Sequence, residues 1–428
     1  MTIQDSLPRA SNIARAELGN GIVLLAYENP AVQSVNLMGS LHAGSLYEES
    51  QQNGLASLTA SALLTGTRGR SFEQLHSALE DNGADLGFRA HVHKLGFSGK
   101  ALAEDLPLLI DVANDVLRNP VFPAEHVERL RGERLTWLQY SQFDTRYRAS
   151  RAMREALYPA NHAYHYSPSG SEATLAGLDV TDLAAFHAQH VGPRGMIIVV
   201  VGAVAADEAL ALAAEAFDDW RKDDQPPALA VAAPNRAAES LRQDVYVPGK
   251  TQADICMGIV GPARRADDFL AAQLANSVLG EFGMMGRIGK TVRERQGLAY
   301  YAFSRLGGGH GPEPWTISAG VNPDNVERAI ASIRSEIQRL TSELVSKDDL
   351  ADNQSYFTGR MPLQLESNEG IASRIHSMES YGLGLDYLAS YAQRVQSIDR
   401  DAILAAARRY LSADNMVVAV AGPEQNGA

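Results

Sequence analysis

The chain has 428 residues, of which 45% are hydrophobic and 21% charged, and its net charge is −13 at pH 7. This length exceeds what one compact core usually holds, so we expect at least two domains. The acidic balance argues against binding to nucleic acids or to acidic membranes, because both need basic patches. The one cysteine, Cys256, leaves no internal disulfide possible, and its apolar neighbours favour a small buried side chain over a nucleophile.

No targeting or membrane signal is visible in the chain. Residues 1–8 lack the basic and apolar stretches of a secretory signal. No apolar run reaches the roughly 18 residues that a spanning helix needs. We therefore expect a cytoplasmic protein without a membrane partner.

The predicted elements come twice in a similar order. In the first half they are a strand at 34–42, helices at 54–64 and 75–82, an extended segment at 85–99, helices at 106–117, 124–140 and 182–190, and a strand at 196–202. In the second half they are a strand at 252–260, a helix at 267–280, a strand at 316–321, helices at 325–344, 347–357 and 401–410, and a strand at 416–422. This order predicts an α+β fold of two similar, duplicated halves, each a sheet covered by helices.

A change in composition marks the boundary between the halves. The segment from Arg221 to Pro227 is charged and then prolyl, which indicates a linker of moderate length rather than a flexible Gly/Ser tether. We predict a first half at 1–222, a linker at 223–239 and a second half at 240–428. A linker of this length lets the halves close on each other like a clamshell.

One segment carries a degenerate metal motif. It opens on Gly-Leu-Ala at Gly54 and closes on Gly-Thr at Thr67. This frame resembles that of the pitrilysin-like (M16) zinc peptidases, in which His-x-x-Glu-His places two histidines one helical turn apart. Here the histidine positions hold Ser57 and Ser61, and the glutamate position holds Ala60. Serine is a poor zinc ligand, and alanine cannot take a proton from a bound water.

The resemblance extends over almost the whole chain and implies a third zinc ligand, a glutamate, on the helix at 124–140. That position falls at Leu138, or at Trp137 in the neighbouring register, and both are apolar. Glu133 lies too far along the helix to replace it on the same face. We therefore expect no metal and no other cofactor in this chain.

Four histidines offer an alternative metal site. His91 and His93 alternate in the extended segment and share a face, and His42 or His76 could join them. No cysteine or carboxylate pair completes such a shell, so surface imidazoles are the preferred interpretation.

The second half keeps a different part of the family pattern. The segment from Thr291 to Tyr300 follows a glycine-rich stretch and resembles the family's arginine and tyrosine segment. The resemblance implies that Arg293 and Tyr300 are catalytic in trans, holding the substrate backbone and stabilising the oxyanion. In the alternative interpretation both are fold residues, with Arg293 on a helix surface and Tyr300 packed in the sheet.

The resemblance also implies a functional class. The family includes two-chain enzymes in which one subunit holds the zinc and the other supplies the arginine and tyrosine. We expect a zinc-free, substrate-positioning subunit of a heterodimeric M16-like metallopeptidase, inactive alone. Its partners would be a zinc-bearing subunit of similar size and a peptide substrate. A non-enzymatic structural or peptide-binding scaffold is the alternative, and a metalloenzyme with a relocated site is a third interpretation.

Overall fold

The computed structural model describes residues 7–234 and 240–424, so part of the predicted linker lies outside the described residues. The chain forms two compact units. Unit 1 comprises the chain up to Thr136, Ser167–Leu229 and Met361–Tyr391, and unit 2 comprises Trp137–Tyr166, Ala230–Arg360 and the chain from Ala392.

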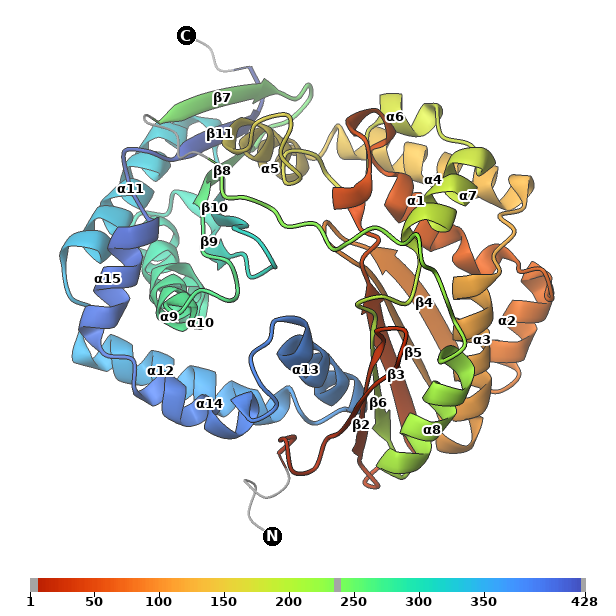
Figure 1. Cartoon of the computed structure of the whole chain (residues 1–428). Helices are drawn as coiled ribbons and strands as arrows, with labels where there is room; N and C mark the ends of the chain where they lie inside the picture. The colour runs from red at the N-terminus through yellow and green to blue at the C-terminus, as the bar shows by residue number, and fades with distance from the viewer. Residues whose placement is uncertain (1–6, 235–239, 425–428) are drawn as a thin grey trace. The chain divides into compact units, whose positions relative to one another are not determined.

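Unit 1 is built on a six-stranded sheet with the order β1-β2-β6-β3-β5-β4. Its strands are β1 (Ala14–Glu17), β2 (Val23–Glu28), β3 (Ser34–Leu41), β4 (Asp85–Ala90), β5 (Leu95–Leu102) and β6 (Ile197–Gly202). Its helices are α1 (Leu55–Ala62), α2 (Phe72–Glu80), α3 (Leu106–Arg118), most of α4 (Ala124–Ser141), α6 (Glu172–Ala176), α7 (Val180–His190), α8 (Ala206–Phe217) and α13 (Asn368–Ser380). Helices α3 and α8 cover one face of the sheet, and α13 packs on β3 and β6 from the other face (Figure 1).

Unit 2 is built on a five-stranded sheet with the order β7-β11-β8-β10-β9. Its strands are β7 (Leu241–Tyr246), β8 (Ala253–Val260), β9 (Ala299–Leu306), β10 (Pro314–Val321) and β11 (Val417–Gly422). Its helices are α5 (Thr145–Leu157), α9 (Phe269–Gly280), α10 (Phe282–Ile288), a π-helical segment (Gly289–Arg295), α11 (Val326–Ser342), most of α12 (Lys347–Leu363) and α15 (Arg400–Tyr410). Helix α14 (Tyr387–Gln396) has its first residues in unit 1 and its last residues in unit 2. Helix α5 packs on β8 and β11, while α9 and α10 contact β9.

The two sheets repeat one plan, which confirms the predicted α+β fold of two similar halves. The order β2-β6-β3-β5-β4 in unit 1 matches β7-β11-β8-β10-β9 in unit 2. In both sheets the first of these pairs is parallel and the others are antiparallel.

Each sheet is covered on one face by a helix from the other half of the sequence. Helix α5 precedes the linker but packs in unit 2, where Ala149 and Met153 join the apolar residues of β11. Helix α13 follows the linker but packs in unit 1, where Ile371 and Ile375 meet Val199. The predicted boundaries 1–222, 223–239 and 240–428 follow the two repeats of the sequence and stay a prediction. The compact units are divided differently, because each contains a helix from the other half of the sequence.

Each half of the chain ends with a helix followed by a buried strand, and in both halves an aspartate caps the start of that helix. Asp179 accepts hydrogen bonds from the backbone of Thr181 and Asp182 at 2.7 and 3.1 Å and begins α7. Asp399 does the same for Ala402 at 2.8 Å and begins α15. Such caps satisfy backbone donors that the first helical turn leaves open. The strands that follow, β6 and β11, are buried along their whole length.

The extended segment predicted at 85–99 is a hairpin, so that prediction was wrong in its middle part. Strands β4 and β5 pair antiparallel, and the backbone of His91 donates to the carbonyl of Lys94 at 2.8 Å in the turn between them. His91 and His93 therefore lie in a turn and do not alternate along a strand. No glycine, proline or asparagine marks this turn, which removes the usual sequence signal.

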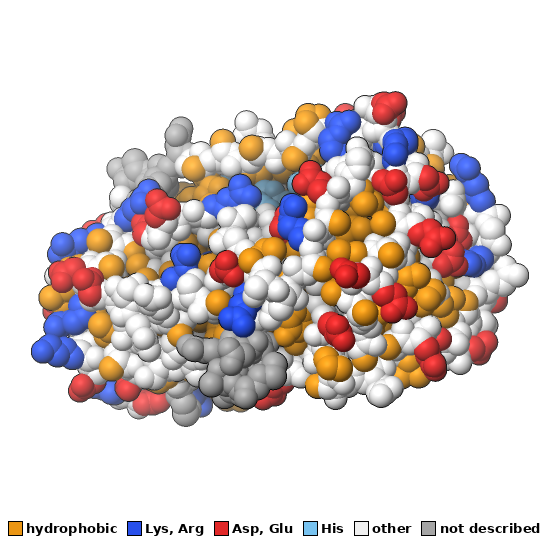
Figure 2. All heavy atoms as spheres, turned by 60° about the horizontal axis from the view of Figure 1, so that its bottom comes forward, with side chains coloured by type: hydrophobic (Ala, Val, Ile, Leu, Met, Phe, Trp, Pro, Cys, Tyr) orange, Lys and Arg blue, Asp and Glu red, His pale blue; other side chains and the backbone are white. Residues whose placement is uncertain are grey.

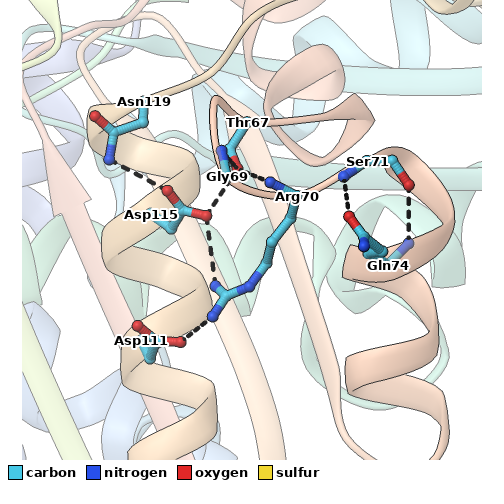
Figure 3. A network of polar contacts seen from close by, with 8 residues as sticks. All are labelled: Thr67, Gly69, Arg70, Ser71, Gln74, Asp111, Asp115 and Asn119. Carbon is cyan, nitrogen blue, oxygen red and sulfur yellow. Dashed lines mark hydrogen bonds and ion pairs between the residues drawn. The ribbon is translucent and has the colours of Figure 1, made fainter.

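The loop after α1 is fixed to α3 by a polar network (Figure 3). Thr67 donates through its hydroxyl to Asp115 at 2.8 Å and accepts from the backbone of Arg70 at 2.9 Å. The Arg70 guanidinium reaches Asp111 at 2.5 Å and Asp115 at 3.4 Å. The Gly-Thr end of the degenerate motif is thereby held against the unit 1 core.

The surface carries charges of both signs. On the face drawn in Figure 2, acidic and basic side chains lie interspersed with apolar ones. Within the described ranges, no helix has the length and apolar character that crossing a membrane would require.

Candidate functional site

An arginine lies between the two serines of the degenerate motif. Ser57 and Ser61 stand one turn apart on α1, and the hydroxyl of Ser61 donates to the carbonyl of Ser57 at 3.0 Å. Arg134, on α4, donates through Nη1 to Ser57 Oγ at 2.5 Å and through Nη2 to Ser61 Oγ at 3.2 Å. A guanidinium therefore binds the two side chains that stand at the histidine positions of the family motif.

A glutamate completes the polar cluster at the start of α1. Glu48 accepts from the backbone of Gly54 at 3.0 Å and of Ala56 at 2.6 Å, and so caps the helix. Burial raises the pKa of the Glu48 carboxyl to about 7, although these hydrogen bonds and the charge of Arg134 act in the other direction. Burial also lowers the pKa of Arg134, and the charge of Glu48 offsets part of that effect.

The residues of this cluster do not fit a zinc ion. The guanidinium of Arg134 repels a second cation, and Ala60 is buried and carries no base. Glu133 points to the surface, where it pairs with Arg129 at 2.7 Å. Leu138 is fully buried and Trp137 is half-exposed. Within residues 7–234 and 240–424, no group of three histidine, cysteine, aspartate or glutamate side chains could hold a metal.

The histidines weighed as an alternative do not gather at one metal site. His76 packs on Phe72, with ring centroids 4.2 Å apart. Burial, together with the charge of Lys94, lowers the pKa of His42 and of His93 to about 4. A neighbouring ammonium group disfavours a metal cation as it disfavours a proton.

The arginine and tyrosine predicted as catalytic lie at the two ends of one turn in unit 2. Arg293 is half-buried on the π-helical segment, and Tyr300 follows at the start of β9. The backbone of Gly297 donates to the carbonyl of Arg293 at 3.1 Å, and Gly297 has φ +61, where side chains are strained. This glycine lets the helix end and the chain turn directly into the strand.

Tyr300 occupies an irregular position in the sheet. Opposite β10, Tyr301 pairs with Gly320 and Ala299 pairs with Val321, so Tyr300 is left without a partner in the ladder. This is a β-bulge, a device that redirects a side chain and is common beside active sites. The side chain of Tyr300 is 83% exposed.

The neighbouring tyrosine anchors the strand. Tyr301 donates through its hydroxyl to Asp254 on β8, and Arg146 on α5 donates to the same hydroxyl at 3.0 Å. The Arg146 guanidinium also lies 4.0 Å from the centre of the Tyr301 ring. Burial raises the pKa of Tyr301, so it stays a neutral donor. Sequence analysis missed this network, Arg134 and Glu48, because no motif marks them.

Comparison with known proteins agrees with this architecture. Residues 23–165 match the family model described as insulinase (peptidase family M16), and residues 162–356 match the peptidase M16 inactive domain. A crystal structure of a peptidase M16 inactive domain from Pseudomonas fluorescens superposes with a TM-score of 0.88 at 23% identity, over 97% of this chain and 100% of that one. A protease from Helicobacter pylori superposes with the same score at 16% identity, over the same shares.

Two curated relatives show the same likeness in sequence. An uncharacterized zinc protease of Streptomyces coelicolor is 25% identical over 402 residues, 93% of this chain and 87% of that protein. The mitochondrial-processing peptidase subunit beta of Rattus norvegicus is 22% identical over 426 residues, 95% of this chain and 83% of that protein. The fold and the degenerate motif together define a zinc-free M16-type chain. The protein belongs to the M16 peptidase family.

Proposed function

We propose that this chain is the substrate-positioning subunit of a heterodimeric M16-like metallopeptidase. Arg293 and Tyr300 serve in trans beside a zinc-bearing partner chain of similar size. The substrate is a peptide, and the chain alone cleaves nothing. As part of this proposal, we place the pair in the cytoplasm.

The exposure of Tyr300 carries this proposal. A tyrosine retained only for packing would bury its ring in the sheet, as Tyr301 partly does next to it. Tyr300 instead stands at a bulge with 83% of its surface exposed. A phenol in this position is free to donate a neutral hydrogen bond to a developing oxyanion, and Arg293 brings a permanent charge near the same turn.

The place of Tyr300 in the sheet supports a peptide substrate. Strand β9 is an edge strand, since it pairs only with β10 in the order of the unit 2 sheet. An edge strand offers unpaired backbone groups to which an extended peptide can add.

The degenerate motif supports the need for a partner. Arg134 binds Ser57 and Ser61, and Ala60 stands at the position of the base, so this motif offers neither a metal site nor a base that could activate water. The alternative is a non-enzymatic scaffold or peptide-binding protein, in which Arg134 and the Tyr301 network serve the fold alone.

Kinetics of a reconstituted pair test the proposal. The chain is co-purified with an M16-like chain carrying an intact His-x-x-Glu-His motif, and peptide cleavage is measured. Tyr300→Phe removes one oxyanion donor and should lower kcat on the order of a hundredfold. Arg293→Ala should lower kcat and raise KM, while assembly of the pair stays unchanged.

Two matched variants serve as controls. Tyr246→Phe changes another exposed tyrosine of unit 2, and Arg305→Ala changes an exposed arginine of the same strand β9. Both should leave the rate unchanged. If Tyr300→Phe and Arg293→Ala also leave the rate at that of the unmodified pair, the catalytic role is refuted and the scaffold is favoured.

A further inference from the structure

Strand β7 forms an open edge of the unit 2 sheet. It stands at one end of the order β7-β11-β8-β10-β9 and pairs with β11 (Figure 1). Within the described part of the chain, no strand pairs with its outer side. Its residues are exposed, apart from Val245, which is partly buried. Strand β9, which carries Tyr300, lies at the opposite end of the sheet, so the proposed function leaves this edge unused.

The repeated plan of the two sheets shows which strand unit 2 lacks at this edge. In unit 1, β1 lies outside β2, the counterpart of β7, and pairs with it antiparallel. In unit 2 the described residues before β7, 231–234, form no strand, and the carbonyl of Ala232 instead accepts from His162 Nε2 at 2.9 Å. An open edge is a template for pairing, so the position that β1 fills in unit 1 is open to a strand of another molecule.

The ladder with β11 determines which backbone groups of β7 face outward. Val247 donates its backbone N–H to the carbonyl of Gly422 at 2.7 Å, so odd-numbered residues direct their backbone groups toward β11. The direction alternates along a strand, so Arg242, Asp244 and Tyr246 direct their backbone groups away from the sheet. These are the groups that an added strand would bond.

The sequence of β7 is complementary to itself in one antiparallel register. Each hydrogen-bonded pair needs an outward-facing residue from both strands, so a two-fold axis must pass through a residue and not between two. With the axis at Gln243, Arg242 of each copy lies opposite Asp244 of the other, and Leu241 lies opposite Val245 on the other face. With the axis at Asp244, two like charges lie opposite each other, which destabilises a sheet.

The side chains of β7 are accessible to such a second copy. Within one chain, Arg242 pairs with Asp244 at 2.9 Å and with Glu327 on α11 at 2.8 Å. Exposed ion pairs of this kind add little to stability, so Arg242 can exchange one partner for its equivalent in the other copy at small cost. Leu241 and Tyr246 are 42% and 58% exposed, and both gain burial when a strand is added.

We propose that two copies of this chain associate through β7, antiparallel and with Gln243 on the two-fold axis, so that their unit 2 sheets join into one. Both copies use the same surface, which gives a closed dimer. The inference goes beyond the proposed function and does not depend on a zinc-bearing partner.

Sedimentation velocity of the full-length chain, measured from about 1 to about 100 µM at physiological ionic strength, tests the inference. The interface is small and partly polar, so we expect a reversible dimer with a dissociation constant in the micromolar range. The net charge of −13 repels two copies, and physiological salt screens this repulsion beyond about 8 Å.

Exchanged charges identify the strand and its register. Arg242→Asp and Asp244→Arg each place two like-charged pairs across the interface and should weaken association about tenfold or more. The double variant with both substitutions restores opposite charges and should recover the dimer. Glu327→Gln is the matched control, because it removes the other partner of Arg242 without changing the strand, and it should leave the dissociation constant unchanged.

A disulfide locates the two-fold axis. At a non-hydrogen-bonded position of an antiparallel pair, opposite Cα atoms lie about 4.5 Å apart, within the range of a disulfide. Gln243→Cys should therefore give a disulfide-linked dimer on mild oxidation, whereas Leu241→Cys, which lies opposite Val245, should not. The native Cys256 is buried and does not compete.

Three results would overturn the inference. They are a chain that stays monomeric over the whole concentration range, a dimer that both single charge variants leave intact, and a dimer in which Gln243→Cys forms no disulfide. No zinc-bearing chain and no peptide enters these measurements, so a negative result leaves the proposed function standing.

Discussion

In the degenerate motif, the guanidinium of Arg134 binds both residues that stand at the histidine positions of the family motif. The guanidinium of Arg134 bonds to both Ser57 and Ser61, and the carboxyl of Glu48 lies close enough for its charge, when ionised, to act on Arg134. A positive charge therefore lies beside the two positions that hold zinc ligands in the family motif. Glu48 also accepts hydrogen bonds from the backbone of Gly54 and Ala56 and so fixes the start of α1.

We expect Arg134→Met to destabilise the protein by about 1–3 kcal/mol, because two hydroxyl contacts are lost and Glu48 keeps its burial without a counter-charge. Arg129→Met, on the same helix, breaks an exposed ion pair with Glu133 and should cost less than about 0.5 kcal/mol. Denaturant unfolding measures both. Equal losses would mean that the cluster at Ser57 contributes no more than a surface contact.

Restoring the motif should not restore zinc binding. The triple change Ser57→His, Ala60→Glu and Ser61→His supplies two ligands and a base, but Arg134 remains and Leu138 offers no third ligand. Elemental analysis should find no stoichiometric zinc in this variant. One tightly held zinc per chain would show that Arg134 and Leu138 do not prevent zinc binding.

At the residue scale, the absence of the zinc ligands and of the base could be predicted from the sequence, but the contact of Arg134 with Ser57 and Ser61 could not. Ser57, Ala60 and Ser61 stand in a recognisable frame, so their deviation is visible. Arg134 is one of several arginines on α4, and only its direction toward α1 distinguishes it. The bulge at Tyr300 depends on its pairing with β10, which no local pattern encodes.

At the scale of elements, the packing of α13 on its sheet includes a buried, neutral histidine. His376 on α13 bonds with Ser40 of β3 at 2.7 Å, and burial lowers the pKa of His376 to about 4. His42 and His93 have similarly low pKa values, and Lys94 lies near all three. His376 on α13 and the two histidines near Lys94, which itself bonds to Ser380 of α13, are therefore uncharged at neutral pH.

Acid should loosen α13. The unfolded pKa of histidine is near 6.5 and the folded values are about 4, so the unfolded state binds more protons between these limits. The free energy of unfolding falls as the pH drops through that window. Amide hydrogen exchange, corrected for its intrinsic pH dependence, should accelerate in residues 368–380 between about pH 6.5 and 4.5.

Helix α8 provides the internal comparison, because it covers the other face of the same sheet and contains no histidine. The variant His376→Gln keeps a hydrogen-bonding group for Ser40 but does not titrate, and should show a smaller acid effect in α13. Parallel acceleration in α8 and α13 would contradict a local effect of these histidines.

Most elements were predictable because apolar periodicity and caps mark them, as at Asp179 and Asp399. The β4–β5 turn was not, since His91 to Lys94 contains no turn residue. Amphipathic patterns also do not say which sheet a helix covers. The placement of α5 in unit 2 and α13 in unit 1 therefore lay beyond the sequence.

At the scale of the whole molecule, this exchange of helices ties the two halves of the chain together. Cleavage at a protease site engineered into the linker at 223–239 would give two fragments. The N-terminal fragment would carry α5, which packs on the sheet of unit 2, and the C-terminal fragment would carry α13, which packs on the sheet of unit 1. We expect the cut fragments to elute together in gel filtration until denaturant is added. Fragments that separate in native buffer would mean that α5 and α13 add little to their sheets.

The same exchange fixes an order of events during synthesis. Unit 1 has its strands by residue 202 but lacks α13 until residue 380 has been made. At about 5–20 residues per second, that interval lasts on the order of ten seconds. During it, Leu25, Val199 and Val201 form an apolar sheet face with no covering helix. We therefore expect this apolar face of the N-terminal sheet to remain uncovered while the second half of the chain is being synthesised.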